Sequence, residues 1–396
     1  MTAAHSIFPP SFAPVGGHCS GAYKVNQEAP EQYSPESEEG TAAHWVASEC
    51  LAMWQKPDGG SPVANFWIGE KAPNGVVIDS EITEAVQVYV DHVLKLAQKY
   101  GALRSMLVEH RVHAPQLHPE NWGTLDFALW DAASRTLYLT DYKHGHRYVA
   151  ARENLQLVNY VAGLINELNF NGLDDQTITA VLQVVHPRCY HSPEGPVSEW
   201  RVKMSDLRPY FNQLSHKMYE AGTNPTLTTG EHCRDCPGRL ECRAARLSGY
   251  ALFDYVAQPY QMDRMSAEHL AVEYDLLQRG INAARARFEA VEADLTHRLR
   301  NGEAGGCGKA LQTTEGRKKW SVPDGVVLLT GKQFGIDASK PGTLTPEQFI
   351  KAAPAGMRSA ASQAVASMST RPAGALKIID AQDSITARAF IPTPTE

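Results

Sequence analysis

The sequence predicts an α/β protein whose central mixed sheet is flanked by helices. Apolar residues recur every three or four positions over 81–100, which indicates a helix with one buried face. Strand-like patterns occur at 106–113, 124–130, 136–143 and 177–186. A helical pattern at 153–168 separates the last two strands, and a helix between two strands is typical of a crossover connection. We therefore expect parallel and antiparallel pairing in one sheet.

Length and composition limit the architectures and partners. The 396 residues suffice for two or three domains, and 43% hydrophobic residues suffice for a buried core. Lysine and arginine total 37 against 44 aspartates and glutamates, a formal net charge of −7. This balance argues against a protein that holds nucleic acid through one broad basic surface. It leaves room for a local basic channel.

The sequence predicts a cytoplasmic protein without a membrane span. No apolar run reaches the ~18 residues that a span needs, and residues 1–10 lack the basic start and apolar stretch of a signal peptide. Thiols stay reduced in the cytoplasm, and the seven cysteines are odd in number. A disulfide framework is therefore not expected.

Composition divides the chain into five segments. We expect an irregular lead-in at 1–38, a core at 39–245, a helical extension at 246–303, a small basic region at 304–352 and a tail at 353–396. The lead-in is rich in Pro, Gly, Ser and Glu, and the first core helix is predicted to begin near Glu39. The tail is rich in Ala, Ser and Pro, which predicts a flexible backbone.

Charged residues interrupt an apolar strand face at Asp141-Tyr142-Lys143. Residues two apart in a strand share a face, so Asp141 and Lys143 continue the line of Leu137 and Leu139. Apolar surroundings accept such charges only when they are paired or bind something. The alternative is a surface ion pair on an edge strand.

A hairpin turn at 131–134 brings a second carboxylate, Asp126, close to Asp141. Two carboxylates repel each other, and a divalent cation with oxygen ligands, Mg²⁺ or Mn²⁺, relieves that repulsion. Such an ion lowers the pKa of a bound water and polarises a phosphoryl oxygen. A nearby lysine positions the nucleophile or stabilises developing negative charge. The two carboxylates, a divalent cation and the nearby lysine together predict phosphodiester hydrolysis.

Four motifs in a fixed order resemble one enzyme superfamily. They are G-x-x-x-H at Gly40–His44, G-x-x-D at Gly123–Asp126, D-x-K at Asp141–Lys143 and Q-x-x-x-Y at Gln156–Tyr160. This order resembles the RecB-like branch of the PD-(D/E)xK nucleases. The resemblance implies a restriction-endonuclease-like core and a metal-dependent DNA nuclease.

The same resemblance implies roles for individual residues. The implied metal ligands are His44, Asp126, Asp141 and Tyr142, and the implied catalytic residues are Asp126, Asp141, Lys143, Gln156 and Tyr160. Gln156 and Tyr160 would position the substrate, and they share a helix face because they lie four residues apart. Glu109 is a further candidate carboxylate, with pairing to Arg111 as the alternative. Outside this set, His44 would be interpreted as a structural histidine.

Three cysteines form a C-x2-C-x5-C run at Cys233, Cys236 and Cys242, which predicts a metal or cluster site. The run is compatible with zinc and with a [4Fe–4S] cluster. The run resembles that of AddB-type nucleases, which implies a [4Fe–4S] cluster with one upstream cysteine. Cys19, in the lead-in, takes that position, and Cys50 is the competing candidate. The implied role is a structural staple that closes more than 200 residues of chain.

The remaining cysteines, Cys189 and Cys307, are interpreted as ordinary thiols. A basic run near the C-terminus predicts DNA contact. Its residues are Arg317, Lys318, Lys319 and Trp320. The cations would bind the phosphate backbone, and Trp320 would stack on a base or pack beneath the loop. The arginines of the helix predicted at 266–300 are interleaved with acidic residues and favour an ordinary solvated face.

Motifs and arrangement together resemble a phage- and prophage-encoded RecB-like nuclease family over roughly residues 10–335. This implies an exonuclease of phage DNA replication or recombination, active in the bacterial cytoplasm. The expected partners are DNA and a phage recombination or single-strand-binding protein. A non-catalytic, cluster-stabilised DNA-binding or scaffold protein is one alternative, and an endonuclease subunit of a larger complex is another. Polarity, strand preference and oligomeric state stay open.

Overall fold

A computed structural model describes residues 6–380, apart from 29–33, 56–59, 61, 100–105, 171, 191, 257–265, 304–306, 316–317, 341 and 372. The chain divides into two compact units, with the boundary between Arg287 and Phe288. The first unit contains the central sheet, and the second is a smaller α/β unit.

The first unit is built on a five-stranded mixed sheet with the order β1-β2-β3-β4-β5. The strands are β1 (Met106–His113), β2 (Trp122–Asp131), β3 (Thr136–Tyr142), β4 (Thr179–Val185) and β5 (Val197–Lys203). β3 and β4 pair in parallel, and the other neighbours are antiparallel. The structure thus confirms a mixed α/β architecture.

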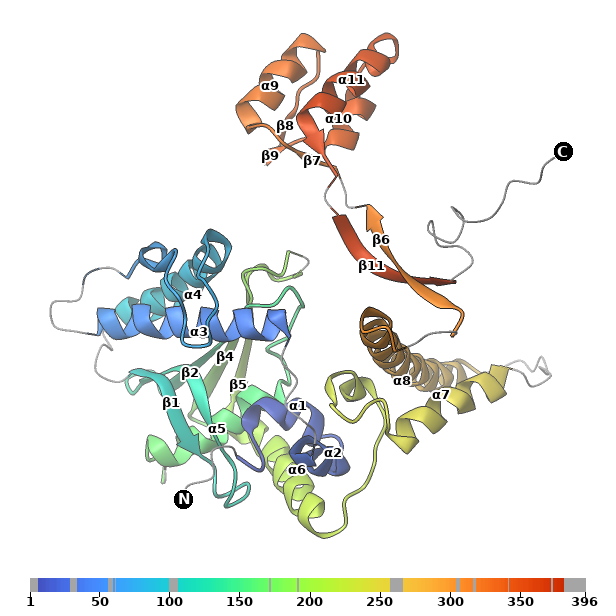
Figure 1. The fold of residues 1–396 in the computed structure, drawn as a ribbon. Coiled ribbons are helices and arrows are strands. Elements are labelled where there is room, and N and C mark those ends of the chain that lie inside the picture. Colours follow the sequence, from blue (N-terminus) through green and yellow to red (C-terminus); the bar gives the residue numbers. More distant parts are fainter. Residues whose placement is uncertain are drawn as a thin grey trace. The chain divides into compact units, whose positions relative to one another are not determined.

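Helices cover both faces of this sheet (Figure 1). α3 (Pro35–Trp54) and α4 (Ser80–Lys99) pack on one face, against Tyr138 and Val181. α5 (Leu155–Glu167) and α6 (Met204–Thr223) pack on the other face, against the neighbouring residues of the same strands. This alternation buries every residue of β3, the middle strand, in which leucine and tyrosine occupy four of the seven positions.

The N-terminal segment differs from the predicted irregular lead-in. It contains η1 (Pro10–Phe12), α1 (Ala13–Gly16) and α2 (Ser20–Glu28). Tyr23 is fully buried, and its ring packs edge-on against Phe8. Burial of such aromatic side chains orders a segment whose composition suggests a loop.

The first core helix begins earlier than the Glu39 predicted from sequence. Ser34 caps it by accepting a hydrogen bond from the Ser37 amide, and Oγ of Ser37 accepts one from the Ser34 amide. Pro35 occupies the first helical position, where no amide donor is needed.

β5 and α6 were not predicted from the sequence. β5 is an edge strand with exposed charged residues, so it lacks the apolar run of a central strand.

The described part of the first unit also contains two 3-10 helices and two further α-helices, of which the last continues past the boundary at Arg287. They are η2 (Ala64–Trp67), η3 (Glu231–Asp235), α7 (Arg243–Val256) and α8 (Ala267–Arg300). α8 matches the helix predicted at 266–300. None of the helices in the described ranges combines the length and apolar character that crossing a bilayer requires.

The second unit contains a small helical core and three two-stranded sheets. Its elements are β6 (Lys309–Glu315), β7 (Lys319–Trp320), α9 (Asp324–Gln333), β8 (Ser339–Lys340), β9 (Gly342–Thr343), α10 (Pro346–Ala352), η4 (Ala355–Met357), α11 (Arg358–Met368), β10 (Ser369–Thr370) and β11 (Ala373–Asp380). The flexible tail predicted from 353 is therefore structured as far as Asp380. Its helix α11 buries Ala361 and Val365 in a cluster with Phe349. β11 pairs with β6.

Candidate metal-binding and catalytic site

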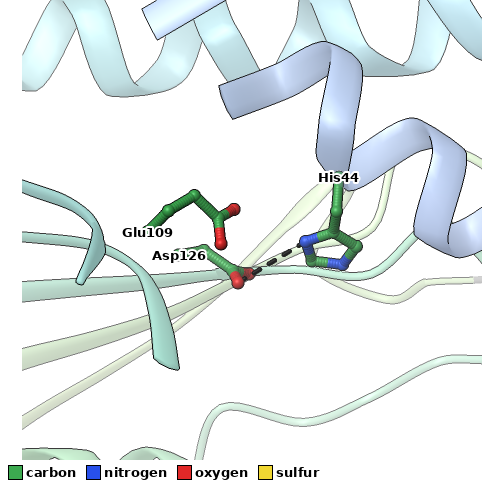
Figure 2. A group of neighbouring side chains, drawn as sticks. All are labelled: His44, Glu109 and Asp126. Carbon is green, nitrogen blue, oxygen red and sulfur yellow. Dashed lines mark ion pairs between the residues drawn. The ribbon is translucent and has the colours of Figure 1, made fainter. Parts of the chain in front are cut away.

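Three side chains from three different elements converge beside the sheet (Figure 2). His44 comes from α3, Glu109 from β1 and Asp126 from β2. One ligand atom from each lies within 4.8 Å of the other two. One imidazole and two carboxylates form a donor set that suits a divalent cation such as Mn²⁺ or Mg²⁺.

Glu109 reaches this group from a distorted point in β1. Its neighbours Val108 and His110 pair with β2, whereas Glu109 has no partner in the ladder and adopts a φ of 45°. A left-handed backbone is costly for a glutamate, and such strain concentrates at functional sites. Arg111, the alternative partner predicted for Glu109, instead places its guanidinium 4.3 Å from the centre of the Trp122 ring.

His44 and Asp126 form an ion pair within this group, with 3.5 Å between Nδ1 and Oδ1 (Figure 2). Burial lowers the pKa of His44, but the Asp126 carboxylate outweighs burial and raises it to about 9. Burial likewise raises the pKa of Asp126, but His44 and the Tyr142 amide outweigh it and lower that pKa. The Tyr142 amide donates to Oδ2 of Asp126 at 2.6 Å. This bond orients the carboxylate and leaves Oδ1 toward His44.

Removal from water and the nearby Asp126 carboxylate raise the pKa of Glu109 to about 7, although the residue as a whole is exposed. The Asp126 carboxylate therefore disfavours the ionised form of Glu109. A cation between them would relieve the repulsion and favour both charged forms.

Asp141, predicted as a metal ligand, is not a member of the group of three. It is buried on the α5 side of β3, where Nζ of Lys143 lies 3.0 Å from its Oδ2. Gln156 donates from Nε2 to Oδ1 of Asp141 at 2.8 Å. Oδ2 receives no aligned hydrogen bond, so this buried oxygen has capacity for a further positive partner.

The charges of Asp141 and Lys143 depend on each other. Burial, together with the charge of Asp126, raises the pKa of Asp141 even though Lys143 acts against the shift. Burial disfavours the ammonium of Lys143, but Asp141 and Asp126 outweigh it and hold the pKa of Lys143 above its usual value. Lys143 is therefore a cation throughout the physiological range.

The remaining two predicted residues have structural partners. The hydroxyl of Tyr160 donates to the Thr124 carbonyl at 2.6 Å, which ties α5 to the G-x-x-D segment of β2. The hydroxyl of Tyr142 lies 2.8 Å from Nδ1 of His144, so its ring extends away from Asp126 while its amide holds that carboxylate. The ring also packs against His44, with 5.2 Å between the centroids.

A polar network next to the site was not predicted. Arg188 places Nη1 2.6 Å from Oε1 of Glu39, and His144 lies 3.1 Å from the same oxygen. Arg188 also pairs with Glu81 at 2.8 Å. His144 follows the D-x-K motif directly and Glu39 precedes Gly40, so proximity to the motifs is the only signal in the sequence. The network joins α3, α4 and the loops that follow β3 and β4.

Four cysteines line one cavity of about 600 Å³. They are Cys19, Cys233, Cys236 and Cys242, the predicted set. Burial and the three neighbouring thiols raise the pKa of Cys236 to about 11. Cys50, the competing candidate, is instead buried in the core between α3 and α4. Cys189 and Cys307 do not line the cavity.

The cavity lies where the N-terminal helices meet the chain after α6. The Gly21 amide donates to the Thr226 carbonyl at 2.9 Å, and the Thr228 amide donates to Sγ of Cys19 at 3.4 Å. A Cβ on Gly238 would lie 2.3 Å from Cγ1 of Val25, so only glycine permits this approach. These contacts bring Cys19 to the C-x2-C-x5-C run.

The predicted basic run lies in the second unit. Arg317 is outside the described residues, Lys318 is half-buried, and Lys319 belongs to β7. Nε1 of Trp320 donates to the Leu344 carbonyl at 2.6 Å, and its ring packs edge-on against Phe349. Trp320 is thus part of the core beneath this loop.

A family model with the description "Protein of unknown function (DUF2800)" matches residues 5–384. The match includes both the carboxylate–lysine site and the cysteine cavity.

Proposed function

This chain belongs to the DUF2800 family, and we propose that it is a metal-dependent deoxyribonuclease of the RecB-like PD-(D/E)xK type. One observation carries the proposal: Asp126, Asp141 and Lys143 gather where the pairing between β2 and β3 ends, next to a ligand group that includes His44 and Glu109. These groups come from separate motifs, and a structural ion pair would not require such convergence. Phosphodiester hydrolysis uses all of them.

The donor set fits the implied metal. His44, Glu109 and Asp126 supply one nitrogen and two carboxylates, and the buried Oδ2 of Asp141 is a further oxygen without an aligned donor. A bound Mg²⁺ or Mn²⁺ would lower the pKa of a water and draw charge from a phosphoryl oxygen. The main-chain amide of Tyr142 fixes the orientation of Asp126 in advance.

Lys143 acts as a fixed positive charge in this proposal. Its pKa is held above the usual value by Asp141 and Asp126 after they outweigh burial, so it does not serve as a base near neutral pH. Nζ of Lys143 lies 3.0 Å from Oδ2 of Asp141 and 3.1 Å from Oε1 of Gln156. A remaining proton can donate to a phosphate oxygen as negative charge develops there.

A nuclease assay with matched variants tests the proposal. Linear and circular, single- and double-stranded DNA would be incubated with Mg²⁺, Mn²⁺ or EDTA. We expect cleavage with either metal, none with EDTA, and a loss of at least about 100-fold in Lys143→Ala and Asp141→Asn. Asp175→Asn, which removes a carboxylate paired with Arg208 outside the site, is the control and should cleave normally. Full activity in Lys143→Ala would overturn the assignment.

Topology of the substrate separates the two nuclease classes. Loss of linear DNA with survival of circles would establish the proposed exonuclease of phage replication or recombination, whereas cleavage of circles would favour the endonuclease subunit. Binding of DNA without cleavage under every metal condition would favour the non-catalytic scaffold. The exonuclease would act in the bacterial cytoplasm, with a phage recombination or single-strand-binding protein as its partner.

We further propose that the four cysteines bind a [4Fe–4S] cluster. The cavity of about 600 Å³ has room for eight cluster atoms, whereas zinc, bound at about 2.3 Å, needs four sulfurs that converge on one point. The cluster would join α2 to the segment after α6 and would be structural. Anaerobically purified protein should be brown, with absorbance near ~400 nm and four irons per chain. Colourless protein with stoichiometric zinc would reject the cluster.

A further inference from the structure

α8 carries an apolar stripe with a strict seven-residue repeat. Its members alternate in steps of four and three residues and are Leu270, Tyr274, Leu277, Ile281, Ala284, Phe288, Val291 and Leu295. A straight helix has 3.6 residues per turn, so a repeat of 3.5 drifts around it. The stripe stays on one side only when the helix supercoils around another helix.

Six of the eight stripe residues are exposed to solvent in the described structure, and Ala284 and Leu295 are half-buried. Tyr274 is 68% exposed, Ile281 54% and Phe288 65%. An apolar surface of this extent is unusual on a protein without a partner, because each side chain would gain free energy by leaving water.

A different side of α8 is covered. Ala286 and Ala290 are buried on that side. Nη1 of Arg287 donates to the Arg239 carbonyl at 2.8 Å. The covered side of α8 therefore presents small side chains and one arginine, whereas the large stripe residues Tyr274, Ile281 and Phe288 are exposed.

The stripe is complementary to itself when two copies of α8 run antiparallel. With the two-fold axis between Ile281 and Ala284, each of these residues faces the other in the second copy. Tyr274 then faces Val291, so a large residue meets a smaller one again. Such alternation fills a helical interface without voids. A parallel pair would set Ala284 against Ala284 and Phe288 against Phe288, which leaves a gap beside a crowded layer.

The area of the stripe agrees with such a pair, whereas the flanking charges do not favour it. The exposed parts of the stripe amount to roughly 600 Å² per copy, given that an aromatic side chain buries roughly 150–250 Å², so the pair would bury about 1,200 Å². That value reaches the lower bound for stable interfaces. Asp294 would flank Glu273 of the second copy, but its charge is already offset by Arg298, whose Nε lies 2.7 Å from Oδ2.

We propose that α8 forms an antiparallel coiled coil with α8 of a second copy, which makes the protein a homodimer. The pairing is independent of nuclease activity and of the cysteine cluster, because none of their residues belongs to the stripe.

The mass of the full chain in solution tests the proposal. We expect sedimentation equilibrium at micromolar concentration to give a dimer for the wild type and a monomer for Ile281→Glu/Phe288→Glu, with dimerisation weakened at least 100-fold. Val272→Glu and Leu276→Glu are matched controls, because both residues are exposed apolar positions of α8 outside the stripe. Both should stay dimeric. A monomeric wild type, or a dimeric Ile281→Glu/Phe288→Glu variant with a native circular dichroism spectrum, would overturn the proposal.

Cysteine cross-linking tests the orientation. In an antiparallel pair residue 274 faces 291, so Tyr274→Cys and Val291→Cys chains should form a disulfide-linked dimer when mixed. Neither variant should cross-link alone. Cross-linking of Tyr274→Cys with itself would overturn the antiparallel arrangement.

Discussion

Gln156 and Asp141 lie on different elements and are joined by a hydrogen bond of 2.8 Å from Nε2 to Oδ1. The amide oxygen of the same side chain accepts from Nζ of Lys143 at 3.1 Å. Gln156 therefore holds the carboxylate and the cation of the D-x-K motif with opposite ends of one amide group. In this structure Gln156 is a positioning residue for the two groups that we propose to act in catalysis.

Replacing this amide should reduce activity more than stability. Gln156→Leu keeps the volume of a buried side chain but removes both hydrogen bonds. Because such outer contacts are typically worth 10- to 100-fold in metal affinity or activity, we expect a loss of about that size in nuclease rate. The rate would be measured with saturating Mn²⁺ on linear DNA.

The control for this variant is Asn154→Ala. Asn154 caps α5 by accepting from the Gln156 and Leu157 amides. Its loss should destabilise the protein by about 1 kcal/mol and leave the rate nearly unchanged. Equal effects of the two variants on the rate would show that Gln156 acts only through the stability of α5.

Metal binding should release a proton from His44. The pKa of His44 is raised to about 9, chiefly because the Asp126 carboxylate outweighs burial, whereas a metal ligand must be neutral. At pH 8 Glu109 is already ionised, because its pKa is about 7. We therefore expect about one proton to be released for each Mn²⁺ bound at pH 8. The affinity of the protein for Mn²⁺ should rise with pH until about pH 9. Calorimetry in two buffers of different ionisation enthalpy measures this proton.

The same shift predicts how the metal-free protein responds to pH. A pKa raised in the folded state stabilises the protein fully below the unfolded value of 6.5, and this contribution disappears as the pH rises through about 9. Thermal unfolding in EDTA should therefore show a loss of stability between pH 6.5 and 9 that is absent in His44→Gln. The absence of proton release at pH 8 would contradict the assignment of His44 as a ligand.

The two motif glycines should respond differently to a methyl group. A Cβ on Gly40 would meet nothing within 4 Å, whereas a Cβ on Gly123 would lie 2.6 Å from Cδ of Pro10. Gly40→Ala should therefore stabilise α3 by about 0.5–1 kcal/mol. Gly123→Ala should destabilise the protein by about 1–3 kcal/mol. Thermal unfolding measures both.

Gly40 has no packing role, so we expect it to serve the substrate. It lies one turn before His44 on the same side of α3. If the DNA backbone passes over this turn, Gly40→Ala will weaken DNA binding several-fold while the protein becomes more stable. A more stable variant with unchanged affinity would exclude contact at this turn.

The parts of the site that were predictable depend on short-range geometry. Asp126, Asp141 and Lys143 belong to one hairpin, and the period of two in a strand determines which of them share a face. Gln156 and Tyr160 follow within one helix. Glu109 was a candidate carboxylate with Arg111 as the alternative partner, but no residue pattern predicts the backbone distortion at this position.

Long-range contacts explain what the sequence did not predict. Arg188 meets Glu39 across 149 positions, and each residue alone resembles an ordinary surface charge. The N-terminal helices and α11 are ordered by burial against distant partners, so their local composition indicated loops. Cys19 was predicted from a family resemblance, because spacing alone did not separate it from Cys50.

Substitution of single cysteines should identify the fourth cluster ligand. Cys19 lines the cavity with the three downstream cysteines, whereas Cys50 is buried between α3 and α4. We expect Cys19→Ser to lose the brown colour and most of the iron, and Cys50→Ala to keep both with a modest loss of stability. Because the cluster would close a loop of more than 200 residues, its loss should cost at least about 3 kcal/mol in the free energy of unfolding. Iron content and thermal unfolding measure the two effects. Iron retained in Cys19→Ser but lost in Cys50→Ala would reverse the assignment.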